Sequence, residues 1–276
     1  MRGRVRNTVT MLELEFAQAS DSGRVRDHNE DFLGYVLPTV AEQEQTPGWL
    51  FALADGVGGQ QMGEVASRTA VETLLAGFRQ AARGEPLRSL LPRLVQAANE
   101  KVFETGLAAK SGGVAMATTL VACALRFDRV VVSHVGDSRC YSIRHGRATA
   151  LTRDHTVVGE RSRLGLISAR EAAQAETRHI LTRSLGGAMF VGVETRDHLL
   201  LSGDVLLLCS DGLHGAVSAA DMAEIVTRNT DLNAAAQELI DAAKERDGSD
   251  NISVQLIRIR SVERVGIYRG RPYKLA

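Results

Sequence analysis

Residues 118–143 read TTLVACALRFDRVVVSHVGDSRCYSI, and this stretch decides the fold class. Three runs rich in Val, Leu and Ile, at 118–125, 130–135 and 140–143, are separated by the short turns RFDR and GDSR. Runs of this length and composition are typical of β-strands. Turns this short join antiparallel neighbours, so we expect a meander of antiparallel strands.

The flanking segments add further strands and helices in clusters. Strands are expected at 12–19, 31–37, 49–54, 199–201, 205–210 and 251–259, and apolar residues at helical spacing predict helices at 63–82, 87–103, 221–228 and 232–246. A doubly wound parallel sheet would need one helix after each strand, whereas here the helices come in pairs. The order favours an α+β fold, a four-layer α/β/β/α sandwich of two antiparallel sheets flanked by helix pairs.

The composition limits the class of protein and its partners. The 276 residues include 33 Lys and Arg and 33 Asp and Glu, so no basic excess attracts nucleic acid. The longest apolar runs are shorter than the roughly 20 residues that span a bilayer, and the basic start lacks the pattern of a secretory signal. The three cysteines are widely separated, unlike a disulfide framework. We therefore expect a cytoplasmic protein without membrane insertion or a nucleic-acid partner.

We expect one domain over residues 1–276, with a core at about 12–260. Residues 154–177 are polar, rich in Arg and Ala and only weakly periodic, which predicts a mobile, partly helical surface insertion. Residues 261–276 form a short basic tail that we expect to lie outside the packed core. No internal repeat and no low-complexity linker divides the sequence.

Two apolar segments end in the same dipeptide, LFALADG at 50–56 and LLLCSDG at 206–212. A strand that ends in Asp-Gly places a carboxylate at a sheet edge, where the glycine lets the backbone approach a ligand closely. Asp-Gly is also a common turn dipeptide, so either copy alone is more simply a turn. Two matched copies of this motif favour a ligand-binding site over two simple turns, but only modestly.

Two other aspartates lie where strands are expected to begin, Asp31 and Asp250. In antiparallel sheets the starts of strands lie beside the ends of their neighbours, so these residues could meet Asp55 and Asp211 at one end of a sandwich. Convergent carboxylates repel without cations, and ligation by oxygen alone suits Mg²⁺ or Mn²⁺ better than Zn²⁺. From spacing alone, scattered and solvated surface acids are an equally good interpretation.

Seven short motifs follow one another along the chain in an order that is also found in a known protein family. They are SDSGRVRDHNED from Ser20, ADGVGG from Ala54, VGDSR from Val135, LTRDHT from Leu151, LTRSLG from Leu181, SDGL from Ser210 and SDNIS from Ser249. From Ala17 to Val254 the chain thus resembles the metal-dependent protein phosphatase family, protein phosphatase type 2C, and specifically its compact bacterial members. The resemblance implies a serine/threonine phosphoprotein phosphatase, which is a phosphoric monoester hydrolase.

Carried over position by position, the resemblance implies a site for two metal ions, Mn²⁺ or Mg²⁺. The implied ligands are Asp31, Asp55, Asp211, Asp250 and the carbonyl of Gly56. Asp137 would hold a third, weaker ion together with Asp211. Glu30 would hold a water of the metal site. Arg26 would grip the substrate phosphate, a task that its planar fork performs better than a lysine.

The reaction implied by the resemblance is direct hydrolysis. A water shared by two metal ions roughly 3.5–4 Å apart would attack phosphorus in line, without a phosphoenzyme. The metals would lower the pKa of that water and neutralise phosphoryl charge, while Arg26 orients the group. The expected partners are phosphoprotein substrates, including a eukaryotic-like bacterial Ser/Thr kinase that the enzyme opposes. The expected state is a monomer.

The chain departs from the family pattern at two places. Val57 stands where many eukaryotic relatives carry a histidine, so the group that protonates the leaving group is unassigned. Residues 114–119 read VAMATT, with alanines for both glycines of the usual Gly-Met-Gly-Thr-Thr, which is expected to affect a loop and not the metals. The insertion at 154–177 matches the family's flap, and its sequence does not identify a substrate.

Three alternative functions fit parts of the sequence. Cys123 and Arg129 have the spacing of cysteine-dependent phosphatases, but the five residues between them contain no glycine and lie between strand-like runs. A binding module without catalysis would be expected to lack one of the metal aspartates, and a two-metal nuclease would need a basic excess. No role is assigned to the histidines, because a lone histidine beside apolar strands is more often structural. These are His134, His155, His179 and His214.

Overall fold

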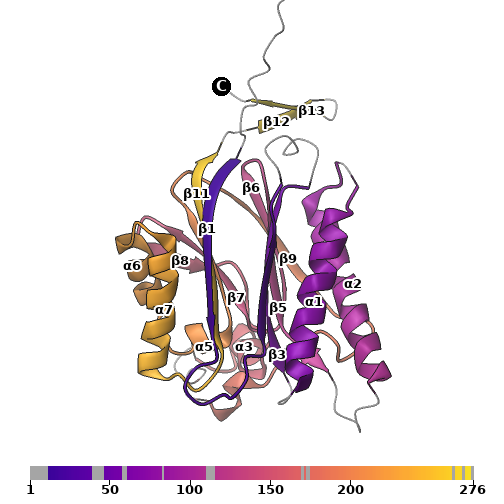
Figure 1. Ribbon diagram of the computed structural model, residues 1–276, viewed down its shortest axis with the longest axis vertical. Coiled ribbons are helices and arrows are strands. Elements are labelled where there is room, and N and C mark those ends of the chain that lie inside the picture. The colour runs from indigo at the N-terminus through magenta and orange to yellow at the C-terminus, as the bar shows by residue number, and fades with distance from the viewer. Residues whose placement is uncertain are drawn as a thin grey trace, which may run out of the picture.

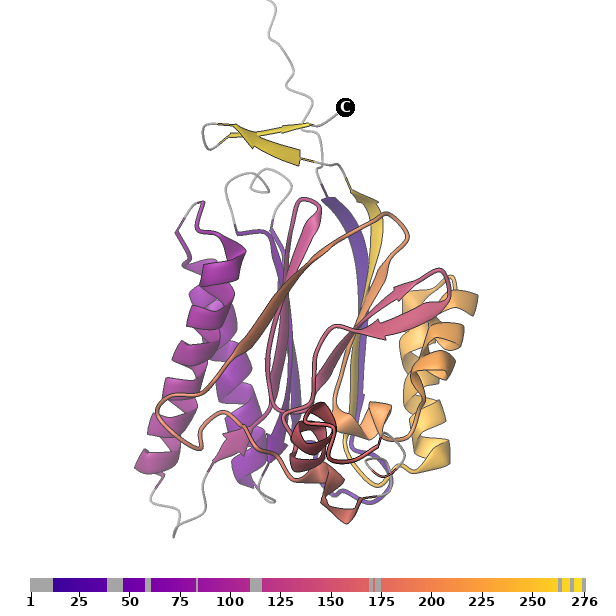
Figure 2. The same cartoon turned by 180° about the vertical axis from the view of Figure 1, so that it is seen from behind.

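The chain forms two large antiparallel sheets that lie face to face, and a pair of helices covers the outer face of each (Figures 1 and 2). The computed structural model describes residues 12–38, 47–57, 61–82, 84–109, 116–168, 171, 175–262, 265–268 and 271–274. This architecture confirms the predicted α+β fold and its four layers.

The first sheet has the strand order β1-β11-β10-β7-β8. Its strands are β1 (Leu12–Asp21), β7 (Arg139–Arg144), β8 (Arg147–Ala150), β10 (Val205–Cys209) and β11 (Ile252–Val262). Two helices, α6 (Ala219–Arg228) and α7 (Leu232–Arg246), pack on its outer face and bury an apolar layer there. Ser218 and Asp231 cap these helices by accepting backbone N–H donors, as is usual for a first turn.

The second sheet has the order β2-β3-β5-β6-β9, and the short strand β4 pairs with the end of β3. Its strands are β2 (Asp31–Val36), β3 (Trp49–Val57), β4 (Ala117–Thr118), β5 (Leu120–Arg126), β6 (Arg129–Val135) and β9 (Glu194–Leu199). The helices α1 (Gln61–Arg79) and α2 (Leu87–Ala108) cover its outer face.

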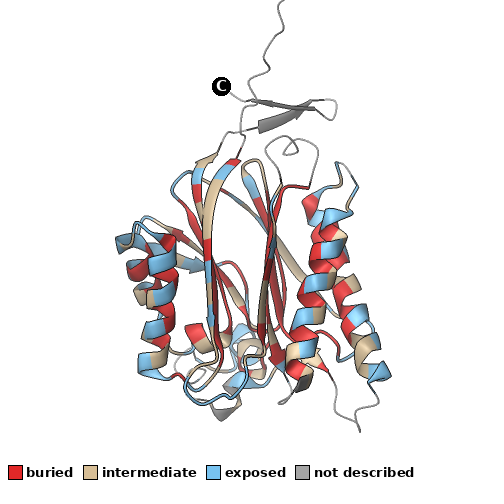
Figure 3. Ribbon diagram, in the orientation of Figure 1, coloured by how far each residue is buried: buried red, intermediate tan, exposed pale blue. Residues whose placement is uncertain are grey.

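Each central strand supplies side chains to two apolar layers. In β3, Leu50 and Ala52 pack against the helix pair, whereas Phe51 and Leu53 lie between the sheets. Strand β10 divides its side chains in the same way between the central core and α6–α7. Because both faces are covered, residues 49–54 of β3 and the whole of β10 are apolar and buried (Figure 3).

The predicted three-stranded meander is wrong at its third strand. Strands β5 and β6 pair as a hairpin, but β7 pairs with β10 in the other sheet. Val132 of β6 and Cys140 of β7 both belong to the central core, so the two strands bury these side chains across the gap between the sheets. Residues 136–138 therefore cross from one sheet to the other, and Asp137 lies at the end of the sandwich.

Other elements differ less from expectation. The strand expected at 199–201 ends at Leu199, while β8 and the short helix α5 (Asp211–His214) had no predicted counterpart. The insertion contains α3 (Val157–Arg163) and the 3-10 helix η2 (Glu176–His179), so its partly helical character is confirmed. After β11, β12 (Val265–Tyr268) and β13 (Arg271–Lys274) form a separate hairpin. No helix in the described part of the chain has the length and apolarity to cross a membrane.

Candidate active site

Asp31 and Asp55 form a directly opposed cross-strand pair on β2 and β3. Asp31 begins its strand and Asp55 lies near the end of its own, as expected for antiparallel neighbours. Two threonines hold the main chain at Asp55. Its N–H donates to Thr119 Oγ1 at 3.0 Å, and its carbonyl accepts from Thr118 Oγ1 at 2.8 Å.

Asp211 and Asp250 come from the other sheet, where Asp211 follows β10 and Asp250 precedes its antiparallel neighbour β11. The glycine of each Asp-Gly dipeptide permits a close approach of two backbones. A Cβ at Gly212 would lie 2.1 Å from the carbonyl oxygen of Asn251, and one at Gly56 would lie 2.3 Å from a carbonyl oxygen in α1. Close packing, and not only turn geometry, therefore requires glycine at both positions.

A pocket of about 1040 Å³ opens at this end of the sandwich. The predicted site residues that line it are Arg26, Glu30, Asp55, Gly56, Asp137, Asp211 and Asp250. Asp31 is buried beside Asp55, and its Oδ2 accepts a hydrogen bond from the Ser210 hydroxyl at 2.8 Å. The structure thus brings all of the predicted residues together, while their roles as ligands stay predictions.

Burial and mutual repulsion raise the pKa values of three of these carboxyl groups. Burial raises the pKa of Asp31 to about 7, and the nearby charges of Asp211 and Asp250 add to the effect. For Asp55, burial and then the charge of Asp31 raise the pKa well above its usual value. Burial also raises the pKa of Asp137 to about 7, with Asp211 contributing. Such a cluster favours either protonation or a bound cation.

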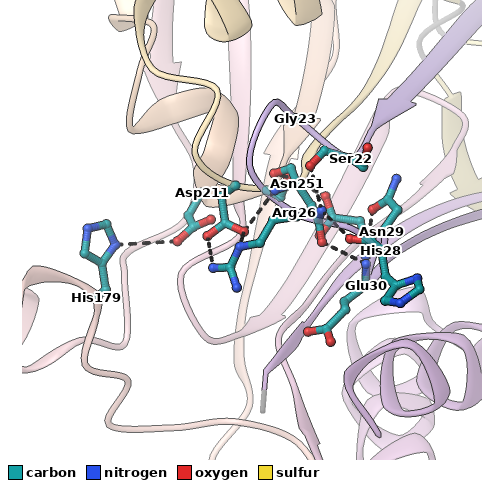
Figure 4. A network of polar contacts seen from close by, with 12 residues as sticks. Ser22, Gly23, Arg26, His28, Asn29, Glu30, His179, Asp211 and Asn251 are labelled. Atoms are coloured by element: carbon teal, nitrogen blue, oxygen red, sulfur yellow. Dashed lines mark hydrogen bonds and ion pairs between the residues drawn. The ribbon is translucent and has the colours of Figure 1, made fainter. Parts of the chain in front are cut away.

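Asp211 differs from the other three because a histidine lies beside it. Burial alone would raise the pKa of Asp211, but the adjacent His179 imidazole brings it below the usual value, with His214 contributing. His179 Nδ1 lies 3.6 Å from Asp211 Oδ2 (Figure 4). His179 ends η2, just after the insertion at 154–177, so η2 reaches the carboxylate cluster through this contact. No pattern in the sequence indicates this contact, because it depends on the path of a segment with little periodicity.

The donor atoms fit a hard divalent cation. Asp31 Oδ1 is buried and has no hydrogen-bond partner among the described residues, which is unusual for a carboxylate oxygen. The predicted ligand set consists of carboxylate oxygens and one carbonyl, the ligands that Mg²⁺ and Mn²⁺ prefer. A cation would satisfy the orphaned oxygen and relieve the repulsion that raises the pKa values.

A second group of potential ligands, His134, His155 and Glu194, places its donor atoms within 4.8 Å of one another. The Gly136 N–H donates to His155 Nδ1 at 3.2 Å, so this nitrogen accepts, and His155 Nε2 lies 3.6 Å from Glu194 Oε2 and 3.4 Å from Arg183 Nη1. A metal-bound imidazole needs the opposite arrangement, in which its second nitrogen donates. The two histidines stack with ring centroids 4.7 Å apart, and their hydrogen bonds give them a structural role.

Arg26 and Glu30 reach the pocket from the loop between β1 and β2. Arg26 binds Asp250 through two contacts of 3.0 Å, Nε to Oδ1 and Nη2 to Oδ2. The Asp250 charge raises the pKa of Arg26, and burial raises the pKa of Glu30. The guanidinium therefore lies at the pocket, paired with a predicted ligand, and its binding of phosphate stays a prediction.

Asn251 holds this loop in place, a role that the sequence analysis missed. Its amide donates to the carbonyls of Ser22 and His28 at 3.1 and 2.9 Å, and its Oδ1 accepts from the Glu30 N–H at 2.8 Å (Figure 4). The same turn thus supplies Asp250 as a candidate ligand and anchors the loop that carries Glu30. The only sequence signal was the adjacency of Asp250 and Asn251.

The cysteine-dependent alternative does not fit the structure. Cys123 is completely buried in the central core, and burial raises the pKa of its thiol. A nucleophilic cysteine needs the opposite, an accessible thiol with a lowered pKa. Of the two departures from the family pattern, Val57 lies at the pocket beside Gly56, while residues 114 and 115 lie outside the described residues.

Comparison with known proteins agrees with this site. The family model described as Protein phosphatase 2C matches residues 27–254. The chain belongs to the protein phosphatase 2C family. One protein similar to this protein phosphatase 2C member is the serine/threonine phosphatase stp of Listeria innocua serovar 6a. The two are 36% identical over 245 residues, which cover 86% of this chain and 93% of that protein.

The fold of this protein phosphatase 2C member is also similar to solved structures of other phosphatases. The S. agalactiae serine/threonine phosphatase has a TM-score of 0.81 and 34% identity, with 90% of this chain and 100% of that chain covered. The catalytic domain of the phosphatase PstP, in complex with two manganese ions, has a TM-score of 0.73 and 31% identity over 90% and 99% of the chains. The predicted enzyme class, a serine/threonine protein phosphatase, is confirmed.

Proposed function

We propose that this chain hydrolyses phosphoserine and phosphothreonine in proteins with two divalent cations held in the carboxylate pocket. One observation carries the proposal. Asp31 and Asp55 from one sheet converge with Asp211 and Asp250 from the other, and the buried Asp31 Oδ1 has no hydrogen-bond partner within the described part of the chain. Because the chain belongs to a family of protein phosphatases, the proposed reaction is the hydrolysis of phosphate esters in proteins.

The proposed ligands of the two Mn²⁺ or Mg²⁺ ions are Asp31, Asp55, Asp211, Asp250 and the carbonyl of Gly56, and Asp137 with Asp211 would hold a third, weaker ion. When bound, the ions supply an activated water for attack on phosphorus and offset charge on the phosphoryl oxygens. The chain's own contribution is to fix the carboxylates. The Ser210 hydroxyl holds Asp31, and the threonines at 118 and 119 hold the main chain of Asp55.

Arg26 would orient the phosphate at the mouth of the pocket. A guanidinium has five N–H donors, and Asp250 occupies two nitrogens of this one, so donors remain for phosphoryl oxygens. Glu30, on the same loop, would hold a water of the metal site. Asn251 keeps this loop against the turn that carries Asp250, so the phosphate-binding and cation-binding groups keep one relative position.

In the cell, we propose that the substrates are phosphoproteins and include a eukaryotic-like bacterial Ser/Thr kinase that this enzyme opposes. The proposed state is a cytoplasmic monomer of one phosphatase domain. The substrate class and the kinase follow from the resemblance of the seven motifs to compact bacterial phosphatases, and the localisation and the single domain follow from the composition and length of the chain.

The test measures phosphate release from a phosphothreonine peptide, with manganese and with a chelator. Asp211→Asn should lower kcat by about 10³-fold or more, since loss of a metal ligand removes about 4 kcal/mol of transition-state stabilisation. Asp247→Asn is the matched control, because Asp247 lines the same pocket but is not a predicted ligand. It should retain most of the activity.

Turnover that persists in chelator, or an equal loss in both variants, would contradict the two-metal proposal. A parallel assay with an aryl phosphate tests the substrate. If the phosphopeptide is hydrolysed no better than the aryl phosphate, the phosphoprotein assignment is wrong even where the metal site is right.

A further inference from the structure

The turn that carries Asp137 crosses between the sheets, so no strand ladder holds residues 136–138. Side chains hold this turn instead. The Ser138 and Thr119 hydroxyls share a hydrogen bond of 2.6 Å, and Gly136 exchanges two hydrogen bonds with His155. These contacts fix the turn on either side of Asp137. The main chain of Asp137 itself is held by a different residue.

That residue is His214, whose Nε2 lies 3.0 Å from the carbonyl oxygen of Asp137. A carbonyl only accepts hydrogen bonds, so Nε2 carries the proton and donates. Burial lowers the pKa of His214 to about 4, which agrees with a neutral ring that has one N–H to give. His214 also lines the pocket.

The position of His214 connects two candidate ligands. The short helix α5 begins at Asp211 and ends at His214, and the Gly215 N–H donates back to the Asp211 carbonyl at 2.7 Å. The neighbouring Leu213 is completely buried and anchors this helix in the core beneath α7. One rigid turn of helix therefore carries Asp211 at its start and, at its end, the ring that binds Asp137.

We propose that His214 is a positioning residue that couples Asp137 to Asp211, so that the two carboxylates meet one cation. This inference rests on the proposed function, because it takes these aspartates as the ligands of the weaker third ion. His214 acts through the Asp137 main chain, since the hydrogen on its Nε2 is committed to that carbonyl. The proposal assigns His214 neither to the cation nor to the substrate.

The experiment measures manganese binding to the full chain by calorimetry, together with thermal unfolding to verify that each variant is folded. His214→Leu removes the donor, and His214→Gln keeps an amide N–H that can reach the same carbonyl. Asp137→Asn shows how far manganese binding weakens when this candidate ligand is itself changed, and the other variants are compared with it. The control is His198→Leu, because His198 is a partly buried histidine on β9 outside the pocket.

His214→Leu should weaken the weakest manganese-binding step by about tenfold or more, as expected for loss of a residue that orients a ligand. The same defect is expected in Asp137→Asn, and the double variant should be no worse than Asp137→Asn, because both changes act on one interaction. His214→Gln should restore most of the affinity. His198→Leu should bind manganese as the wild type does.

The proposal is overturned if folded His214→Leu binds manganese like the wild type, whatever its melting temperature, since His214 would then be purely structural. Additive defects in the double variant, or a Gln variant as impaired as the Leu variant, would also overturn it. If the Leu variant does not fold, His214→Asn, whose shorter amide does not reach the carbonyl, takes its place with the same expectations. The binding isotherm needs no turnover, so a wild type that binds manganese but leaves phosphopeptides intact contradicts the proposed function alone.

Discussion

The pocket has a floor and a rim that are built differently. The floor comprises Asp31, Asp55 and Asp137, and the rim comprises Arg26, Glu30 and His179. Asp31 and Asp137 are 8% and 6% exposed and lie on or between strands of the two sheets. By contrast, the side chains of Arg26 and His179 are 51% and 59% exposed and come from a loop and from the end of η2. Under the proposed function, the core of the sandwich sets the cation positions, whereas the groups proposed to face a substrate lie on segments outside the two sheets.

The largest expected effect concerns the stability of the floor without cations. In chelator, burial raises the folded-state pKa of Asp137 from 3.8 to about 7. The folded state therefore binds more protons than the unfolded state between these values, and stability falls as pH rises through this window. The loss attributable to Asp137 should be of order 2–4 kcal/mol. Urea unfolding of wild type and Asp137→Asn at several pH values measures it.

The free energy of unfolding of the wild type, relative to Asp137→Asn, should decrease across the window and then level off above it. Saturating manganese should reduce this decrease, because a cation favours the ionised carboxylate. Asp197→Asn, on β9 outside the pocket, is the control and should run parallel to the wild type. If the free energies of unfolding of the wild type and Asp137→Asn change with pH in parallel, burial in the floor does not raise the pKa of the Asp137 carboxyl group.

A smaller effect should follow from removing the hydroxyl that braces Asp31. Ser210 Oγ donates to Asp31 Oδ2 at 2.8 Å and accepts from the Ser253 N–H at 3.0 Å. Ser210→Ala should weaken manganese binding roughly 10–100-fold, the usual cost of losing a partner that orients a ligand. Calorimetry measures the affinity. Ser133→Ala is the matched control, because Ser133 is also completely buried but bonds to Thr195 away from the pocket.

Manganese binding that is equally weakened in both serine variants would show that general loss of a buried hydroxyl, and not the brace on Asp31, is responsible. Unchanged binding in Ser210→Ala would show that the strand pairing of Asp31 with Asp55 alone fixes the carboxylate.

The floor was more predictable from the sequence than the rim, for a physical reason. Strands buried on both faces are largely apolar, so the ends of LFALADG and LLLCSDG stood out. Antiparallel pairing indicated that the four aspartates could meet at one end of the sandwich, and the structure pairs Asp31 with Asp55. The crossing at 136–138 was missed, because β7 has the same apolar pattern whichever sheet it joins. Only the folded structure decides whether β7 pairs with β6 or with β10.

Rim contacts were not predictable because they join segments that are distant in the sequence. Asn251 contacts the loop before β2, and His179 contacts Asp211 from the end of η2. Neither contact has a periodic pattern or a spacing rule. The resemblance of the motifs supplied Arg26 and Glu30, but the pairing of Arg26 with Asp250 emerged only from the structure.

The smallest expected effect tests the rim through that pairing. Arg26→Lys keeps the charge but removes the planar fork, so KM for a phosphopeptide should rise about tenfold while kcat changes less. Manganese affinity should not change measurably, because a half-exposed ion pair with Asp250 contributes little to holding that carboxylate. Arg24→Lys is the matched control, since Arg24 lies exposed on the same loop but does not line the pocket.

Steady-state kinetics and calorimetry on these two variants separate the rim from the floor. A loss of manganese affinity in Arg26→Lys would mean that the rim helps to build the cation site, and the division between the two regions would fail. Equal KM changes in Arg26→Lys and Arg24→Lys would instead assign the effect to the charge of the whole loop. Only a rise in KM confined to Arg26, with cation binding intact, is consistent with a substrate-facing group on a cation site that the core has already fixed.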